Sequence, residues 1–181
     1  GAVIFNTERE EGFAVFVVDN TNRTEARYWI DDFLRVRQRQ DNYHNTHNTL
    51  AMCKKYVTKH LSKEFEVSKA DQAELLNETM KYFQEQESFS MDDFSEKVIR
   101  QPEVVESFTR FRQEYEQDRD IRIEDEFGIS DSAVKKQARS YKSVIKLDRN
   151  FHIYVHGNRN LLEQGEDEKG KFYKVYYEEE E

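Results

Sequence analysis

The sequence predicts an α+β fold: a helical region followed by a small C-terminal antiparallel β-sheet, with an N-terminal β-hairpin. Two features of the sequence predict this order. Apolar residues recur every three or four positions, behind helix-capping residues, through the middle of the chain. Short runs rich in β-branched and aromatic residues, bounded by turn residues, occupy its two ends. We therefore expect a hairpin in residues 1–20, a helical region in residues 21–120 and an α+β region in residues 121–181.

The composition is that of a folded protein with a highly charged surface. Of the 181 residues, 36% are charged and 13% are aromatic, and aromatic side chains bury large apolar areas. No apolar run approaches the about 20 residues of a membrane helix, and the start of the chain has no signal-peptide pattern. The single cysteine, Cys53, cannot form an internal disulfide or a four-cysteine zinc site, and it suits a reducing compartment.

The N-terminal hairpin is expected from two apolar runs, residues 2–5 and 13–18, on either side of a polar turn that ends in Gly12. The second run is uninterrupted, which favours a strand buried on both faces. The chain starts with Gly1 directly before the first run, which is typical of a boundary inside a longer protein. On that interpretation, the hairpin is what a truncated N-terminal domain leaves behind.

Five helices are expected between residues 21 and 120, because apolar residues there recur at helical spacing. The first begins near Arg23 and fades over residues 38–42, and the second covers about residues 47–65 with Cys53 on its apolar face. Capping-box spacing predicts the starts of three helices, and a proline suits the first turn of the last. These signals are Asn22 with Glu25, Ser68 with Asp71, Ser90 with Asp93, and Pro102.

After Asp120 the pattern changes from helical to extended. Ser130 is expected to cap a helix that runs to about Arg139. In the strand expected at residues 151–156, alternation predicts that Phe151, Ile153 and Val155 face the core while the residues between them face water. The other expected elements are short strands at residues 121–123, 141–147 and 171–177, a tight turn at residues 148–150 and a polar loop at residues 164–170.

The net charge of −9 is unevenly spread along the chain. Residues 21–63 carry nine basic and four acidic side chains, a net charge of +5. Residues 71–120 carry six basic and fourteen acidic side chains, a net charge of −8. Residues 127–163 carry seven basic and three acidic side chains, a net charge of +4. Two basic segments therefore flank an acidic one, and basic segments are the electrostatic footprint of a protein that binds phosphate backbones.

The cations of the two basic segments are the candidate nucleic-acid contacts. In the second segment, spacings of three and four residues place Lys135 or Lys136 beside Arg139 on one helical face. Their alternative role is that of ordinary solvated helix faces, and cations near the end of a helix also favour its dipole. The candidate contacts are Arg35, Arg37, Arg39, Lys135, Lys136, Arg139, Lys142 and Arg159.

The segment of residues 150–159 combines aromatic, histidine, asparagine and arginine side chains at the end of a strand. Such groups can contact phosphates or exposed bases. The alternative is a plain hairpin, in which Gly157 and Asn158 supply the positive φ angles of the turn.

No arrangement of catalytic or metal-binding residues is apparent, so we expect no enzymatic activity, no cofactor and no metal. The spacing of the possible metal ligands His44, His47, Cys53 and His60 matches no standard zinc site. Adjacent carboxylates on a helix point in different directions, which argues against a calcium site and against a metal-dependent nuclease. The sequence contains no P-loop, GxGxxG, GxSxG or HExxH motif.

Several segments together resemble the bacterial nucleoid-associated protein family (NdpA/YejK-like), and its Bacteroidetes members most closely. The similarity covers about residues 13–177 and consists of whole segments rather than a catalytic motif. The segments are YWIDDFL (28–34), RQDNY (39–43), FEVSKAD (65–71), AVKKQAR (133–139), KLDRNFHI (146–153) and KFYKVYY (171–177). The resemblance implies a C-terminal fragment of a longer family member.

The resemblance also implies a cytoplasmic, nucleoid-located protein that associates with double-stranded DNA and has no enzymatic activity. The hypothesis is therefore non-enzymatic association with DNA through basic patches, with little sequence specificity. The alternative is a protein-interaction or dimerisation module whose DNA-binding surface lies in a missing N-terminal half. Double-stranded DNA is the expected partner and a second copy of the chain the other candidate, with no membrane and no small-molecule substrate.

Overall fold

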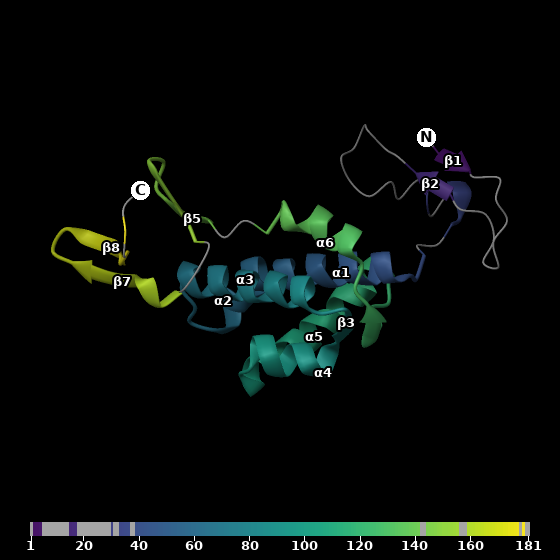
Figure 1. Ribbon diagram of the computed structural model, residues 1–181, viewed down its shortest axis with the longest axis horizontal. Coiled ribbons are helices and arrows are strands. Elements are labelled where there is room, and N and C mark those ends of the chain that lie inside the picture. Colours follow the sequence, from purple (N-terminus) through teal and green to yellow (C-terminus); the bar gives the residue numbers. More distant parts are fainter. Residues whose placement is uncertain are drawn as a thin grey trace. The chain divides into compact units, whose positions relative to one another are not determined.

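The computed structural model describes residues 2–4, 15–17, 30, 33–36, 39–141, 144–155, 159–177 and 179 (Figure 1). The chain divides into two compact units, Gly1–Arg39 and Gln40–Glu181, each of which is described by itself. Helices dominate the second unit and short antiparallel strand pairs complete it, so the predicted α+β class is confirmed. Within the described residues, no helix has both the length and the apolar character needed to cross a membrane.

The first unit contains the predicted N-terminal strand pair. Strands β1 (Ala2–Ile4) and β2 (Val15–Val17) pair antiparallel, with Ala2 opposite Val17 and Ile4 opposite Val15. Val15 and Val17 are only half-buried, in contrast to the burial on both faces that their uninterrupted apolar run predicts. Most residues of the helix expected after Arg23 lie outside the described ranges.

The second unit opens with one continuous helical run. Helix α1 (Asn42–Lys55) leads into the π-helical turn η2 (Tyr56–His60) and the short helix α2 (Leu61–Glu64). The run begins five residues before the predicted start at His47, because Asp41 is its N-cap and accepts a 3.0 Å hydrogen bond from the His44 N–H. The sequence interpretation had assigned Asp41 to the fading end of the preceding helix. Cys53 is buried on the inner face, as predicted.

Helix α3 (Lys69–Glu85) begins with the predicted capping box. The Asp71 N–H donates to Ser68 Oγ at 3.0 Å, and the Ser68 N–H donates to Asp71 Oδ2 at 2.8 Å. For Ser90 and Asp93, the predicted helix is present but the predicted capping interaction is not. Ser90 ends strand β3 (Ser88–Ser90) and makes no side-chain cap for α4 (Met91–Phe94) and the π-turn η3 (Ser95–Ile99). Asp93 instead accepts a 2.8 Å hydrogen bond from the Tyr82 hydroxyl.

Helix α5 (Pro102–Arg119) carries its proline in the first turn, as predicted. The strand expected at residues 121–123 is absent from this described stretch; strand β4 is Glu126–Gly128 and pairs antiparallel with β3. Ile123 is buried as part of a loop, where its N–H donates to Glu116 Oε1 at 2.8 Å. Helix α6 (Asp131–Ala138) follows Ser130, whose side chain contacts Ser132 and does not cap the helix.

Aromatic side chains fill the main core, in keeping with the composition. Its largest fully buried residues come from α1 with η2, α3, β3, α4 and α5, and the Phe89 and Phe127 rings stack across β3 and β4 at 4.8 Å. Aromatic pairs at such distances add to the stability that area burial provides. The fully buried aromatic residues are Tyr56, Phe83, Phe89, Phe94 and Phe108.

The C-terminal strands form two separate antiparallel hairpins. Strands β5 (Val144–Leu147) and β6 (Phe151–Tyr154) make the first hairpin, across the predicted turn at residues 148–150. After the short 3-10 helix η4 (Arg159–Leu161), β7 (Leu162–Asp167) and β8 (Gly170–Val175) make the second. The prediction of a polar loop at residues 164–170 is therefore wrong, because most of these residues belong to β7 and to the turn into β8.

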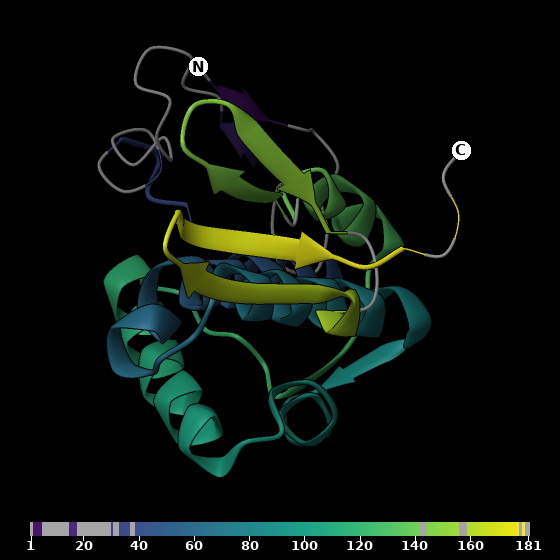
Figure 2. The same cartoon turned by 90° about the vertical axis from the view of Figure 1, so that its left-hand side faces the viewer.

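A second, smaller core holds both hairpins against helix α3 (Figure 2). Ala70 and Ala73 of α3 pack with Ile145, Val155 and Leu162 from the hairpin region. The Asn77 amide also donates to the Val155 carbonyl at 3.1 Å. Val155 is buried and Ile153 half-buried, as their alternation predicts. Phe151 is not: its side chain is 66% exposed, contrary to the prediction.

Candidate nucleic-acid interface

Helix α6 presents three of the predicted cations to solvent. Ala133 and Val134 are buried, whereas Lys135, Lys136 and Arg139 are exposed. The eight-residue helix therefore has one inward face and one basic outward face.

Three hydrogen bonds fasten the region of α6 to α1, so the basic face has a rigid support. At its start, the Ser130 N–H donates to Thr46 Oγ1 at 3.0 Å. In its last turn, Gln137 Nε2 lies 2.9 Å from His47 Nδ1. Beyond it, the buried Tyr141 hydroxyl donates to the Leu50 carbonyl. Cations on such a support keep a fixed spacing, which phosphate contacts require.

An aromatic and imidazole pair on α1 borders the basic face. Lys136 Nζ lies 3.3 Å from the Tyr43 hydroxyl and 6.0 Å from the centre of its ring. The Tyr43 and His47 rings are nearly parallel, at 11°, with centroids 6.3 Å apart. This group offers a cation, a hydroxyl and an imidazole next to one another, which are donors suited to phosphate oxygens.

The cations of α6 differ from those of the acidic segment in their partners. Throughout the described ranges, no carboxylate pairs with Lys135, Lys136 or Arg139. In the acidic segment, four of the six cations have a carboxylate partner from the same segment: the pairs are Lys97–Asp93 at 2.8 Å, Arg100–Glu78 at 3.6 Å, Arg110–Glu106 at 3.0 Å and Arg112–Glu116 at 3.3 Å. Positive charge that no neighbour neutralises is available to an anionic partner.

The structure brings together only part of the predicted set. Lys135, Lys136 and Arg139 share one face of α6. Arg35 and Arg39 are exposed residues of the first unit, and Arg35 has a left-handed φ of 49°. Arg37 and Lys142 lie outside the described residues, as does the side chain of Arg159, whose backbone begins η4.

The sequence interpretation missed the residues that accompany the cations: Tyr43, His47 and Gln137. It considered His47 only as a metal ligand, and Gln137 lies 90 residues away from it in the chain. One local signal was available, because an N-cap at Asp41 starts α1 early enough to put Tyr43 and His47 four residues apart on one helical face. No local signal points to Gln137.

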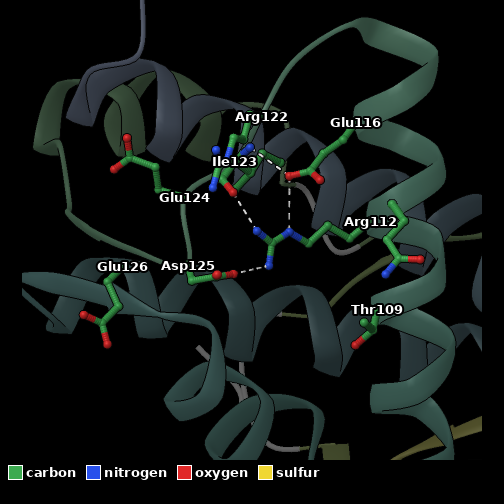
Figure 3. Close-up of a pocket in the computed structure, with 9 residues that line it drawn as sticks. Thr109, Arg112, Glu116, Arg122, Ile123, Glu124, Asp125 and Glu126 are labelled. Carbon is green, nitrogen blue, oxygen red and sulfur yellow. Dashed lines mark hydrogen bonds and ion pairs between the residues drawn. The ribbon is translucent and has the colours of Figure 1, made fainter.

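A hollow of about 500 Å³ beside α5 has a different character (Figure 3). Arg112 crosses it and donates to Glu116 Oε1 at 3.3 Å, Asp125 Oδ1 at 2.5 Å and the Ile123 carbonyl at 2.6 Å. These bonds tie the loop before β4 to α5. Four carboxylates line the hollow against two arginines, a surplus that repels phosphate. We therefore assign it a structural role.

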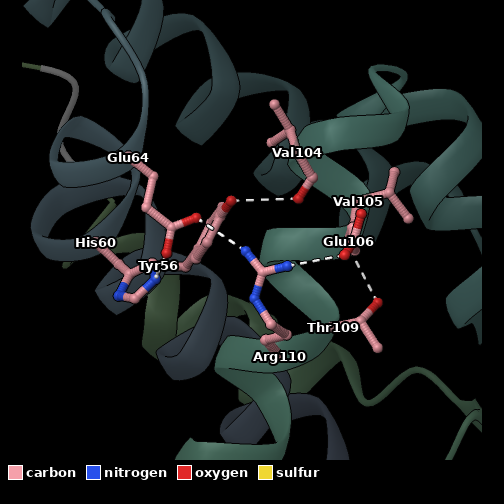
Figure 4. A network of polar contacts seen from close by, with 8 residues as sticks. All are labelled: Tyr56, His60, Glu64, Val104, Val105, Glu106, Thr109 and Arg110. Atoms are coloured by element: carbon pink, nitrogen blue, oxygen red, sulfur yellow. Dashed lines mark hydrogen bonds and ion pairs between the residues drawn. The ribbon is translucent and has the colours of Figure 1, made fainter.

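A polar network joins α2 to α5 and contains His60, one of the possible metal ligands considered from the sequence (Figure 4). Glu64 lies 2.9 Å from His60 Nε2 and 3.2 Å from Arg110 Nη2. The nearby Ser107 hydroxyl, His60 and Arg110 lower the pKa of Glu64.

The chemistry of the other metal and nucleophile candidates is equally limited. Burial raises the pKa of the Cys53 thiol well above its ordinary value, which makes the thiolate scarce and the residue unreactive. His44 Nδ1 lies 2.7 Å from the Asp41 carboxylate at the N-terminus of α1. Within the described ranges, no group of three or more His, Cys, Asp or Glu residues is placed to hold a metal ion.

A family model described as nucleoid-associated protein YejK matches residues 1–180 of the chain. A search of the curated proteins and a search of the solved structures each found no match.

Proposed function

Because the chain belongs to the nucleoid-associated protein YejK family, we propose that it associates with double-stranded DNA through the basic face of α6, without catalysis and with little sequence preference. The observation that supports this most is the contrast in ion pairing. Lys135, Lys136 and Arg139 lack carboxylate partners in the described part of the chain, whereas Lys97, Arg100, Arg110 and Arg112 of the acidic segment have them. The family description supports a location at the nucleoid, and we propose that the protein is cytoplasmic.

The chemistry of this face suits backbone contact better than base reading. Lysines and an arginine on the outward face of a short helix approach phosphates without entering a groove, and such contacts position a protein without specifying sequence. The Tyr43 hydroxyl beside Lys136 adds a neutral donor of the kind that phosphate oxygens also accept. The cations Arg35, Arg37, Arg39, Lys142 and Arg159 are proposed as further contacts.

A titration of DNA binding against salt concentration tests the proposal. Binding should weaken as salt rises, since each phosphate contact contributes about 0.9 to the slope of log affinity against log salt. The variant Lys135→Gln/Lys136→Gln/Arg139→Gln should lower that slope by about 2–3 and weaken binding to all sequences alike.

A matched variant controls for net charge. Lys81→Gln/Lys97→Gln/Arg100→Gln removes the same charge from the acidic segment and should leave the slope within about 0.5 of the wild-type value if phosphates contact α6. Equal losses in the two variants, or wild-type binding that does not respond to salt, would show that α6 is not the DNA contact.

A second candidate function has its own supporting observation. Large apolar side chains stay exposed on the two C-terminal hairpins, and clusters of this kind mark protein interaction sites. On this alternative, the chain is a dimerisation or partner-docking module. Sedimentation velocity over a range of concentrations distinguishes it, because a dimer that dissociates on dilution would favour self-association. The exposed residues are Phe151, Tyr154, Phe172 and Val175 on the hairpins, and Tyr176 and Tyr177 directly after β8.

A further inference from the structure

Phe151, at the tip of the β5–β6 hairpin, is a large apolar side chain in an unusual position. It is the first residue of β6, directly after the turn at residues 148–150, and it is 66% exposed. Its register places it on the same face as Ile153, which packs against the second core. The sequence pattern is therefore that of a buried residue, while the structure leaves the ring in solvent.

The length of the hairpin explains the exposure. Ile145 pairs with Ile153, and Ile145 is fully buried against Ala70 and Ala73 of α3. The next pair on that face, Leu147 with Phe151, lies one step further along the hairpin, where Leu147 still touches the core and Phe151 does not. The ring is thus on a paired strand and lies beyond the second core.

The surroundings of Phe151 are basic. Arg149 precedes it in the turn and Lys146 lies on the other face, opposite His152; all three are exposed. Within the described residues neither Lys146 nor Arg149 has an ion-pair partner. Asp148 is the only acidic residue between 144 and 155. Such a tip can approach a phosphate backbone without repulsion.

The β5–β6 hairpin and α6 lie on the same side of the second unit (Figures 1 and 2). Figures 1 and 2 both show α6 and the β5–β6 hairpin on the same side of the α1–α3 pair. A duplex bound on that side of the second unit would therefore face both elements.

We propose that Phe151 is a wedge that inserts between adjacent base pairs of bound DNA and bends the duplex. Apolar side chains that enter the minor groove between cations unstack a base step and kink DNA by about 20–90°. Arg149 and Lys146 would hold the flanking phosphates during insertion. This inference rests on the proposed DNA association and adds a deformation that phosphate contacts on α6 alone do not produce.

Fluorescence energy transfer between dyes at the two ends of a short mixed-sequence duplex tests the wedge, with affinity measured in the same samples. The wild-type chain should raise the transfer efficiency at saturation. Phe151→Ala should abolish at least half of that rise and keep the salt slope of binding, whereas Phe151→Leu should retain the bend because it keeps an apolar wedge. Phe172→Ala, which removes an exposed ring from the other hairpin, should bend DNA like the wild type.

The outcomes separate the two proposals. Salt-sensitive binding without any bend overturns the wedge and leaves the DNA association standing. Absence of salt-sensitive binding overturns both. Bending that survives in a Phe151→Ala chain with wild-type circular dichroism, or that is lost equally in Phe172→Ala, overturns the wedge. A change in oligomeric state in Phe151→Ala with bending unchanged would instead assign the ring to self-association.

Discussion

The Glu64 carboxylate couples the stability of the second unit to pH. Ser107, His60 and Arg110 lower its pKa below the ordinary value of 4.5. A carboxylate whose pKa is lower in the folded than in the unfolded chain stabilises the fold above its unfolded pKa, and this stabilisation is lost as pH falls through the folded value. Glu64→Gln should therefore lower the melting temperature at pH 7, and the difference from wild type should shrink below pH 4.5.

The control for this residue is Glu66→Gln, an exposed glutamate two positions further on, with no ion pair among the described residues. Its melting temperature should follow that of the wild type at every pH. If the Glu64→Gln deficit stays constant from pH 7 to pH 3, the network in Figure 4 does not act through the charge of Glu64.

At the scale of single elements, the start of α3 offers a direct test of how local signals set the fold. Ser68→Ala removes the acceptor for the Asp71 N–H and leaves half of the capping box, so it should lower the free energy of unfolding by about 1 kcal/mol. Ser90→Ala should change it by less than about 0.5 kcal/mol, because the Ser90 side chain caps no helix. Urea denaturation measures both values. Equal losses would mean that Ser90 caps α4 in solution.

The elements also show what the sequence could predict. The starts of α3 and α5 were predictable because Ser68 with Asp71 and Pro102 act within one helical turn. Strand β7 was missed because its sequence, LEQGED, is polar, and it is a strand through its pairing with β8. Gly165 has a role in that pairing, since a Cβ there would lie 2.4 Å from Cζ of the Phe172 ring. Tertiary pairing of this kind has no local signature.

In the candidate site, too, features set by local sequence could be predicted and features set by tertiary packing could not. Lys135, Lys136 and Arg139 could be named from the sequence because helical spacing groups them. Their neighbours on α1 could not, since Tyr43 and His47 reach α6 only through the packing of two helices that are far apart in the chain. Phe151 was predicted to be buried because alternation assigns a face to a residue and does not say how far a hairpin extends beyond the core.

At the scale of the second unit, two cores of unequal size predict unequal stability. Among the described residues, the main core contains 22 buried residues, including most of the aromatic ones, whereas the core between α3 and the hairpins contains five. Regions with few buried apolar contacts open before the whole protein unfolds. Exchange of backbone amides in β5–β8 should therefore be faster than in α1, α3 and α5.

Ile145→Ala tests whether the two cores differ in stability, because it truncates the most deeply buried strand side chain of the smaller core. Truncation of a buried isoleucine costs about 2–5 kcal/mol, and here the loss should undock the hairpins before it unfolds the helices. Hydrogen exchange measured by mass spectrometry should speed up in residues 144–175 with little change in residues 42–119. Val144→Ala, at the half-buried neighbouring position, is the control and should leave both regions as they are. Uniform acceleration by Ile145→Ala along the chain would show that the two cores unfold as one cooperative unit.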